Sequence, residues 1–437
     1  MSVAAGCSKS RPWNGDAAVA EELRRRTGLF PLAADVDATG GGLTEVDAVR
    51  QALAQNAAFQ ERLAELGLSR ADVIEAGLLP NPDLQVLFPL SGKNTEATLT
   101  FPLEFLWLRG RREHGARRAS EATTARLVHA GMDLVRDVRL AYADLVLARR
   151  RLALLRQAAE LRQKVADLAA ARVRAGDATP LDELTARVDA LSTKQEAARL
   201  TYEEVVAEER LRALLGIGLL RSPLDLTTVD GEAADAGSAG DDVPPDELVA
   251  SAVADRSDAI GASLAVAAAR DRARLARSEW LLVSGIVDAN ENDNGGYEAG
   301  PGVKLTLPLL NQNQGAVARA EAELERARRQ QRTVRDRIVL DVREAHARLA
   351  QAREQLRVFR TELLPAMERA VDLAEKAYQA GETPFVQVLD ASRLLLDARV
   401  REAQAAADLR KARAELERAV GRRLDLPRPD RTTEQEQ

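Results

Sequence analysis

Three histidines and one cysteine are the residues best suited to metal or nucleophilic chemistry, and their spacing favours neither. His114, His129 and His346 show no metal-ligand spacing with one another or with carboxylates, so we expect ordinary residues on helix surfaces. With only Cys7, the chain cannot form a disulfide scaffold or a cysteine-based zinc cluster. No cluster of catalytic residues is recognisable. The sequence therefore predicts no enzyme, no cofactor and no resident metal.

The surroundings of Cys7 predict a lipid anchor. The segment Val3-Ala4-Ala5-Gly6-Cys7-Ser8 resembles the processing site of a bacterial lipoprotein, where small residues precede a lipid-modified cysteine. Ala4 stands where leucine is usual, and the charged and apolar regions of a signal peptide are missing before it. A start codon assigned too late would explain that gap. The alternative is an incidental surface cysteine in a tail.

Carboxylates beside two glycine-containing turns are the remaining candidates. They are Asp177 and Asp182 near Gly176, and Glu382 and Asp390 near Gly381. Glycine at such a turn supplies positive φ angles. A carboxylate at a helix start is also favoured by the helix dipole, so a solvated structural residue is the alternative to any functional role.

The two turns are equivalent positions of an internal duplication. Residues 165–216 align with residues 370–421 at a constant offset of 205, without a gap. Gly176 falls on Gly381, Leu184 on Leu389 and Gly216 on Gly421. In each copy, the residue pattern predicts strands, a long helix, a turn and a returning helix that ends at a glycine.

Composition favours long helices over a globular core. The 437 residues are 3% aromatic and 30% charged, which is typical of coiled coils and leaves burial to seams between helices. The net charge of −6 is spread along the chain, so nucleic acid is not an expected partner. No run of 18 apolar residues exists, so we expect no transmembrane helix.

The predicted elements fall into two repeats with an arm, a linker and a tail. Apolar spacing near 3.5 residues predicts left-handed supercoiling of the long helices, and Pro365 is expected to kink the second one. The first part comprises an extended arm over 1–42 and a first repeat over 43–216, with a helix over about 44–77, a β-hairpin over 82–107, a long helix over 110–175 and a return helix over 181–216. The second comprises a linker over 217–245 and a second repeat over 246–421, with a helix over about 246–280, a β-hairpin over 281–309, a long helix over 315–380 and a return helix over 384–421, before a disordered tail over 422–437.

The hairpins suggest a membrane. Their strands are expected to be about ten residues long, which is close to what a tilted strand needs to cross a bilayer. Six of the 14 aromatic residues lie in these hairpins: Phe88, Phe101, Phe105, Trp107, Trp280 and Tyr297. Four strands cannot close a barrel, and open edges in lipid leave backbone groups unpaired, so a membrane role requires oligomerisation. Three chains would give twelve strands. The alternative is a small soluble sheet packed on the helices.

Over about 43–421 the chain resembles the TolC family of outer-membrane efflux proteins. The resemblance rests on motifs in order: Leu43-Thr44-Glu45-Val46 with Asn56, Val138–Tyr142, Val342–Ala347, and Tyr378 through Ala391. It implies a mainly α fold with a small β part, assembled as a homotrimer with a 12-stranded outer-membrane barrel on a helical periplasmic tunnel. It also implies a passive duct in the bacterial outer membrane that works with a periplasmic adaptor and an inner-membrane pump.

The resemblance also implies a cargo class and leaves two alternatives. Residues 305–315 resemble the Pro-Leu…Asn-Gln-Gly segment of heavy-metal efflux channels of the cobalt–zinc–cadmium type. Metal ions or small toxic compounds are therefore the expected cargo. The alternatives are the duct of a type I secretion system and a non-membrane coiled-coil scaffold.

Family positions imply a pore and gate at the second turn, with adaptor contacts at Gly176, Asp177, Gly381 and Glu382. Asp390 matches a pore-lining aspartate and Tyr378 matches a gate tyrosine. Gln387 stands where a second aspartate is found, and Thr383 stands where an arginine link is common, so the gate network is only partly present. Asp182 is the equivalent of Gln387 in the first copy. The alternatives are heptad packing for Tyr378 and a solvated helix residue for Asp390.

Overall fold

The computed structural model describes residues 15–29, 42–88, 95–219, 224–227, 243–291, 296–380 and 382–426. The chain divides into two compact units. The first contains Glu61–His129 and Val253–Arg337; the second contains Ala20–Gln60, Ala130–Ala252 and the chain from Ile338 onward. Each unit combines segments from both sequence repeats. Cys7 lies outside the described residues, as does Gly381.

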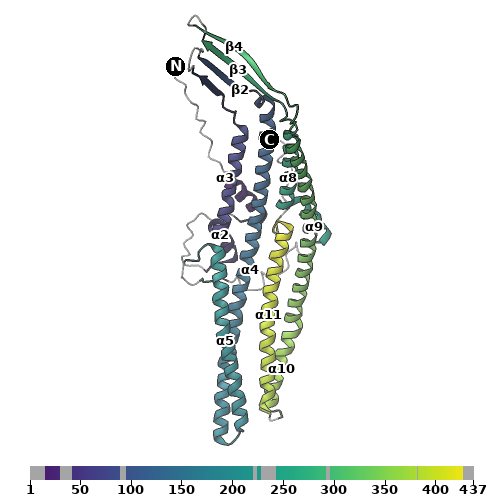
Figure 1. The fold of residues 1–437 in the computed structure, drawn as a ribbon. Helices are drawn as coiled ribbons and strands as arrows, with labels where there is room; N and C mark the ends of the chain where they lie inside the picture. The colour runs from purple at the N-terminus through teal and green to yellow at the C-terminus, as the bar shows by residue number, and fades with distance from the viewer. Residues whose placement is uncertain are drawn as a thin grey trace. The chain divides into compact units, whose positions relative to one another are not determined.

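Long helices make up most of both units (Figure 1). The helices of the first repeat are α2 (Glu45–Gln55), α3 (Ala57–Gly77), α4 (Phe105–Ala175) and α5 (Pro180–Leu215), preceded by α1 (Gly15–Thr27). Those of the second repeat are α7 (Pro245–Asp255), α8 (Ser257–Ala276), α9 (Gln314–Val358), α10 (Leu364–Gln379) and α11 (Phe385–Val420). In the second unit, α4 with α5 and α10 with α11 form two helical hairpins (Figure 1).

The predicted duplication is confirmed at the two return helices. α5 and α11 each span 36 residues and start 205 positions apart. Both end at a glycine in the left-handed region, Gly216 with φ 76° and Gly421 with φ 85°. The glycine N–H and the following N–H reach back to the last turn in each case, as a Schellman cap requires.

The two helices predicted to open the repeats are each interrupted, so the expectation of single helices over 44–77 and 246–280 was wrong. Asn56 separates α2 from α3 with extended backbone (ψ 114°), and Arg256 separates α7 from α8 (ψ 137°). The Asn56 side-chain oxygen accepts from Phe59 N at 2.9 Å, and its amide donates to Leu214 O at 2.9 Å. A short polar side chain that competes for backbone groups ends one helix and caps the next.

Four strands form one antiparallel sheet in the first unit, in the order β1-β2-β3-β4. They are β1 (Asp83–Leu87), β2 (Glu96–Pro102), β3 (Leu282–Glu291) and β4 (Tyr297–Thr306). The second hairpin has the expected ten-residue strands, whereas the first has strands of only five and seven residues. The first hairpin was predicted to continue to Trp107, but its second strand ends at Pro102 and α4 begins at Phe105, with Leu108 N bonded to Glu104 O at 3.0 Å.

The predicted arm and tail contain structure at their inner ends. The arm was expected to be extended, but Gly15–Thr27 is helical, with Arg24 and Arg26 paired to glutamates three and four residues earlier. Arg26 Nη1 donates to Gly421 O at 3.1 Å, and Arg423 N donates to Arg26 O at 2.9 Å. Leu424 is buried, so the expectation of disorder was wrong for residues 422–426.

Only residues 217–219, 224–227 and 243–245 of the linker 217–245 are described, and the long helix of the second repeat is interrupted close to Pro365. Within the linker, Leu226 forms a parallel bridge with Leu43, and α7 begins at Pro245. The interruption predicted near Pro365 takes the form of a π-helical turn, η1 (Phe359–Leu363), directly before α10, which carries Pro365 in its first turn. A proline removes one helical hydrogen bond, and the π turn accommodates that loss.

The interior of the second unit includes a buried ionic cluster among the apolar seams. Arg139 lies between Glu417, to which it donates, and Glu45, at 3.1 Å. Nearby, the Tyr142 hydroxyl lies 3.0 Å from Leu43 O and 3.2 Å from Thr227 O. Burial, with help from the charge of Glu45, raises the pKa of Tyr142 to about 12. The cluster therefore joins segments from both repeats through Arg139, which keeps its positive charge, and through the hydroxyl of Tyr142, which stays protonated at neutral pH.

Candidate functional site

The first hairpin turn joins α4 to α5 and is closed by a complete set of local caps. Gly176 has φ +82°, and Asp177 N donates to Arg172 O at 2.9 Å, which completes a Schellman cap on α4. The Thr179 hydroxyl and amide both donate to Asp182 Oδ2, at 2.7 and 3.0 Å, and the side chain of Thr179 accepts from Asp182 N. These hydrogen bonds from Thr179 lower the pKa of Asp182. Asp182 thus has a local structural role as the third helical residue of a capping box.

The second turn, between α10 and α11, has the same place in the repeat but different chemistry. The cap position before α11 is Pro384, which makes no side-chain cap. Gln387 is exposed, and the buried hydroxyl of Thr383 has no hydrogen-bond partner among the described residues. Asp390, on the next turn, is 60% exposed, with Arg393 Nη1 at 3.4 Å.

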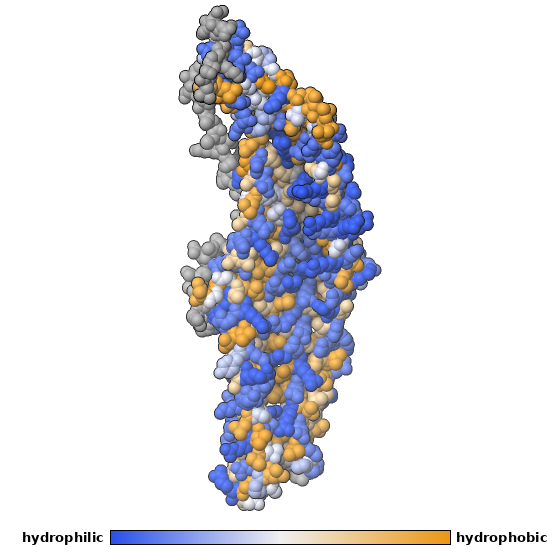
Figure 2. Space-filling view, in the orientation of Figure 1, coloured by the Kyte–Doolittle hydropathy of each residue, from blue (hydrophilic) through white to orange (hydrophobic). Residues whose placement is uncertain are grey.

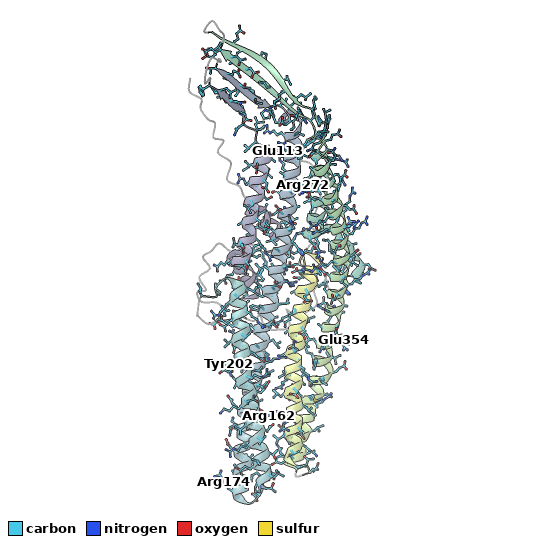
Figure 3. All side chains as sticks on the ribbon, viewed as in Figure 1. Glu113, Arg162, Arg174, Tyr202, Arg272 and Glu354 are labelled. Atoms are coloured by element: carbon cyan, nitrogen blue, oxygen red, sulfur yellow. The ribbon has the colours of Figure 1, made fainter. Side chains whose placement is uncertain are left out.

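Two side-chain links join the hairpins near these turns. Arg172 Nη1 on α4 donates to the Tyr378 hydroxyl on α10 at 3.0 Å. Further from the turns, Asp189 on α5 accepts from Arg393 Nη2 on α11 at 2.5 Å and lies 3.3 Å from Arg162 Nε on α4. Figure 3 labels Arg162 and Arg174 on the turn-proximal part of α4. The structure therefore brings Tyr378 into a cross-hairpin contact that its position alone did not specify, whereas Asp390 contacts Arg393 on its own helix, α11.

Sequence reasoning missed Arg162, Arg172, Asp189 and Arg393. None of the cross-hairpin pairs has helical i, i+4 spacing, and each depends on which helix faces which. The duplication gave no signal either, because Val188 is the counterpart of Arg393 and Leu394 that of Asp189. A search for charged residues that break the repeat symmetry near the turns would have found both Asp189 and Arg393.

Metal-ligating side chains do not gather anywhere in the parts of the chain that the structure describes, where no group of three or more His, Cys, Asp or Glu residues could hold an ion. His129 departs from the expected helix-surface placement. It is half-buried, with Nε2 3.8 Å from Asp258 Oδ2. Asp258 also receives both Nε and Nη2 of the buried Arg256, at 3.0 and 2.7 Å.

The sheet separates apolar from polar side chains across its two faces. Cross-strand partners such as Leu84, Leu99 and Val287 share a face, because directly paired residues point the same way. That face carries Leu84, Val86, Ala97, Leu99, Phe101, Val283, Gly285, Val287, Ala289, Ala299, Pro301, Val303 and Leu305, with Glu291 and Tyr297 as the last pair beside the loop. The opposite face carries Asp83, Gln85, Glu96, Thr98, Thr100, Ser284, Asp288, Asn290, Glu298, Gly300, Gly302, Lys304 and Thr306, with Leu87, Pro102, Leu282 and Ile286 as apolar exceptions.

Many residues of the apolar face are open to solvent in the single chain. Leu84 is 67% exposed and Val303 is 71% exposed. In Figure 2, apolar side chains lie at the surface over the strand region and again near the hairpin turns. Among the described residues, no helix is both long and apolar enough to cross a bilayer.

Solved structures with the same architecture belong to outer-membrane channels. A structure of CusC, whose title concerns folding and transmembrane channel formation, matches with a TM-score of 0.72 and 18% identity, over 91% of this chain and 98% of that one. The outer membrane protein VceC of Vibrio cholerae matches with a TM-score of 0.69 and 18% identity, over 86% of this chain and 95% of that one. Sheet and hairpins together therefore show the fold shared by these membrane proteins.

The sequence places the chain in a named family. The model of the family "Outer membrane efflux protein" matches residues 48–217 and 248–422, which is most of the chain, so this protein belongs to that family. The cobalt-zinc-cadmium resistance protein CzcC of Cupriavidus metallidurans is 26% identical over 403 residues, covering 90% of this chain and 92% of that protein. The expected resemblance is confirmed, and the protein is an efflux channel component of the bacterial outer membrane. The alternative of a non-membrane scaffold was wrong, and the family is one of channels, not of enzymes.

Proposed function

We propose that three copies of this chain form the passive exit duct of a tripartite efflux pump, with their twelve strands closed into an outer-membrane barrel. The observation that carries this proposal is the separation of the sheet into an apolar and a polar face. Such a sheet can present its apolar face to the lipid and its polar face to a water-filled interior, as membrane barrels require. β1 and β4 each pair on one side only among the described strands, and in lipid their free edges must be joined to other strands.

A stripe of exposed apolar residues on α5 independently supports assembly. The stripe follows heptad spacing over Leu181, Leu184, Val188, Leu191, Tyr202 and Val205, all more than half exposed. Tyr202 is labelled on α5 in Figure 3. A run of this length in a single chain needs a partner helix, and a neighbouring copy supplies one.

The assembly is tested by mass measurement in mild detergent, where we expect three chains. Val188→Glu places a charge in the stripe and should weaken the trimer. Lys194→Gln is the matched control, because it changes the net charge by the same unit at an exposed site beside the stripe. A stable wild-type monomer in detergent would refute the barrel.

An adaptor protein is proposed to dock at the two turns, at Gly176, Asp177 and Glu382, with Gly381 expected to contribute. A β-carbon at Gly176 would meet no atom within 4 Å, so the position is open to a partner. Gly176→Glu should abolish efflux and leave trimers in the membrane, whereas Gly176→Ala, which has the same backbone strain without charge, should retain most efflux. Normal pumping by Gly176→Glu would place the adaptor elsewhere.

Divalent metal ions are the proposed cargo. Support comes from the segment 305–315 and from the name of the Cupriavidus relative, a cobalt-zinc-cadmium resistance protein. Deletion of the gene should lower tolerance to cobalt, zinc or cadmium more than tolerance to organic dyes. The reverse ranking would favour small toxic compounds, and loss of a secreted protein instead would favour a type I secretion duct.

Two further roles belong to the proposal. Cys7 is the lipid anchor, so palmitate labelling of the full-length protein should be lost in Cys7→Ser; labelling that persists would exclude it.

Tyr378, together with Thr383 and Gln387, belongs to the periplasmic gate. Because Tyr378 accepts a hydrogen bond from Arg172, Arg172→Gln should raise the conductance of the closed channel in planar bilayers. An unchanged conductance would leave this link a packing contact only.

A further inference from the structure

A hollow lined by arginines lies in the first unit where helices meet the sheet. Its volume is about 590 Å³, and its lining residues are Arg111, His114, Arg118, Asp271, Arg274 and Arg277. Four guanidinium groups therefore face one carboxylate. The residues come from two elements only, the first turns of α4 after β2 and the last turns of α8 before β3. In Figure 3, Glu113 and Arg272 mark these parts of α4 and α8, next to the strands.

The positive charge of this hollow is only partly compensated. Asp271 is shared, with Arg118 Nη1 at 2.6 Å and Arg274 Nη1 at 3.7 Å. Arg277 pairs with Glu321 at 2.5 Å, and Arg111 donates to the neutral Ser278 hydroxyl. Arg274 and Arg277 remain 66% and 61% exposed, so their guanidinium groups are open to a further anion. Planar, multidentate guanidinium groups match phosphate oxygens better than any other side chain does.

Tryptophans beside the hollow point to a membrane surface. Trp107, Arg111, His114 and Arg118 are spaced by four, three and four residues, which puts them along one face of α4. Trp280 lies between Arg277 and the start of β3. Both tryptophans are exposed, by 37% and 49%. Tryptophan gathers at membrane–water interfaces, and arginine one turn further out reaches the headgroups.

We propose that this hollow binds the phosphate of an anionic phospholipid in the periplasmic leaflet of the outer membrane. The proposal rests on the proposed insertion of the sheet in that membrane. The tryptophan rings lie at the level of the acyl chains and glycerol, and Arg111, Arg118, Arg274 and Arg277 surround the phosphate. A bound lipid of this kind fixes the depth of the sheet, since Arg111, Arg274 and Arg277 lie within nine residues of a strand end and Arg118 lies in the fourth turn of α4.

Tryptophan quenching by brominated lipids tests the proposal. Full-length trimers carrying Trp13→Phe, so that only Trp107 and Trp280 report, are placed in nanodiscs of phosphatidylethanolamine with a minor fraction of phosphatidylglycerol. Quenching is compared with bromine on one lipid or the other, at equal mole fraction. We expect phosphatidylglycerol to associate about fivefold more strongly than phosphatidylethanolamine, as expected for one net arginine at a lipid surface.

The test variant is Arg274→Gln with Arg277→Gln, which should bring that ratio close to one. The matched control is Arg328→Gln with Arg329→Gln on α9, two arginines of similar exposure (51% and 77%) that share Glu325. The control should keep the wild-type ratio, and both variants are checked for trimers.

The outcomes separate this proposal from the proposed function. Equal quenching by the two lipids in the wild type overturns the headgroup site and leaves the membrane insertion standing. Absence of quenching by either lipid overturns both. If the wild type shows no preference between the two lipids but its tryptophan fluorescence responds to sodium phosphate and not to chloride at equal ionic strength, the hollow is a site for soluble phosphate and the lipid assignment is wrong.

Discussion

The two hairpin turns occupy the same place in the duplication and differ in almost every side chain. Helix length and the left-handed glycine that ends the return helix are identical in α5 and α11. At the start of those helices, Thr179 and Asp182 in the first copy are replaced by Pro384 and Gln387 in the second. Backbone geometry is thus shared where the hairpins must match in length, whereas the chemistry of the turns has diverged.

The two turns therefore differ in which of their side chains remain available for other contacts. The first is locally complete, because its carboxylate is used by its own helix cap. The second has an uncapped helix start, a buried Thr383 hydroxyl with no hydrogen-bond partner among the residues that the structure describes, and an exposed Asp390. In a proposed trimer the six hairpins would alternate between these two types. The second turn then has the groups that are available to the pore or to a partner.

The largest expected effect concerns the glycines that the copies share. Gly216→Ala should destabilise the protein by about 3 kcal/mol or more, since a β-carbon there would lie 2.3 Å from Gln55 O in addition to the strain of positive φ. Gly176→Ala has only the φ strain, about 1 kcal/mol. Chemical denaturation of the two variants compares them directly. Equal losses would mean that the contact with Gln55 relaxes freely.

The next prediction compares the two residues that interrupt the opening helices, Asn56 and Arg256, by how stability at each depends on pH. Burial alone would raise the pKa of Asp258, but hydrogen bonds from Arg256, together with the nearby charges, outweigh it and lower that pKa. A carboxyl with a lowered folded-state pKa stabilises the fold above its unfolded value of about 3.9, and this stability is lost as pH falls through the folded value.

Asp258→Asn should therefore cost about 2 kcal/mol at neutral pH and remove part of the acid sensitivity. Asn56→Ala disrupts a neutral cap, so its cost should not change with pH. Urea titrations at neutral and acid pH measure both. An Asp258→Asn variant with unaltered pH dependence would show that other carboxylates control acid unfolding.

A smaller effect tests the caps themselves. Thr179→Ala should loosen the start of α5 by about 1 kcal/mol, because it removes the hydroxyl that accepts from Asp182 N and donates to Asp182 Oδ2. Gln387→Ala in the second copy should change nothing there, since Pro384 makes no side-chain cap. Hydrogen exchange of the first-turn amides resolves the two helix starts. Similar exchange in both variants would contradict the asymmetry.

Periodic features of the fold could be predicted from sequence, and contacts between helices could not. The constant offset and Gly216 with Gly421 specified the return helices to within one residue at each end, since heptads and glycine caps are local signals. Asn56 and Arg256 were missed because a single polar residue between two helical patterns also fits a continuous helix. Phe105 and Trp107 were misassigned because two-residue alternation next to a strand cannot show where a helix begins.

In the candidate site, too, local patterns could be predicted from sequence and contacts between helices could not. Asp182 was recognised as a helix-start residue that could be structural, and its capping box is a short-range pattern. The Asp189–Arg393 pair and the Arg172–Tyr378 pair depend on how two hairpins are set against each other, which no single helix encodes. The pore role of Asp390 stays a prediction, and its environment now sets the size of the expected effect.

The smallest effect is expected at Asp390 itself. Threefold symmetry would place three such carboxylates around the pore axis, where they favour cations. Two unit charges at ~4 Å in water interact by only about 1 kcal/mol, and less at pore separations. Arg393, 3.4 Å from Asp390 and also bound to Asp189, reduces the field further. In planar bilayers, Asp390→Asn should thus lower cation preference and divalent block by less than about twofold, whereas Arg393→Gln should raise both. Asp182→Asn in the first copy is the control and should alter neither. A strong loss in Asp182→Asn, with no change in Asp390→Asn, would exchange the roles of the two turns.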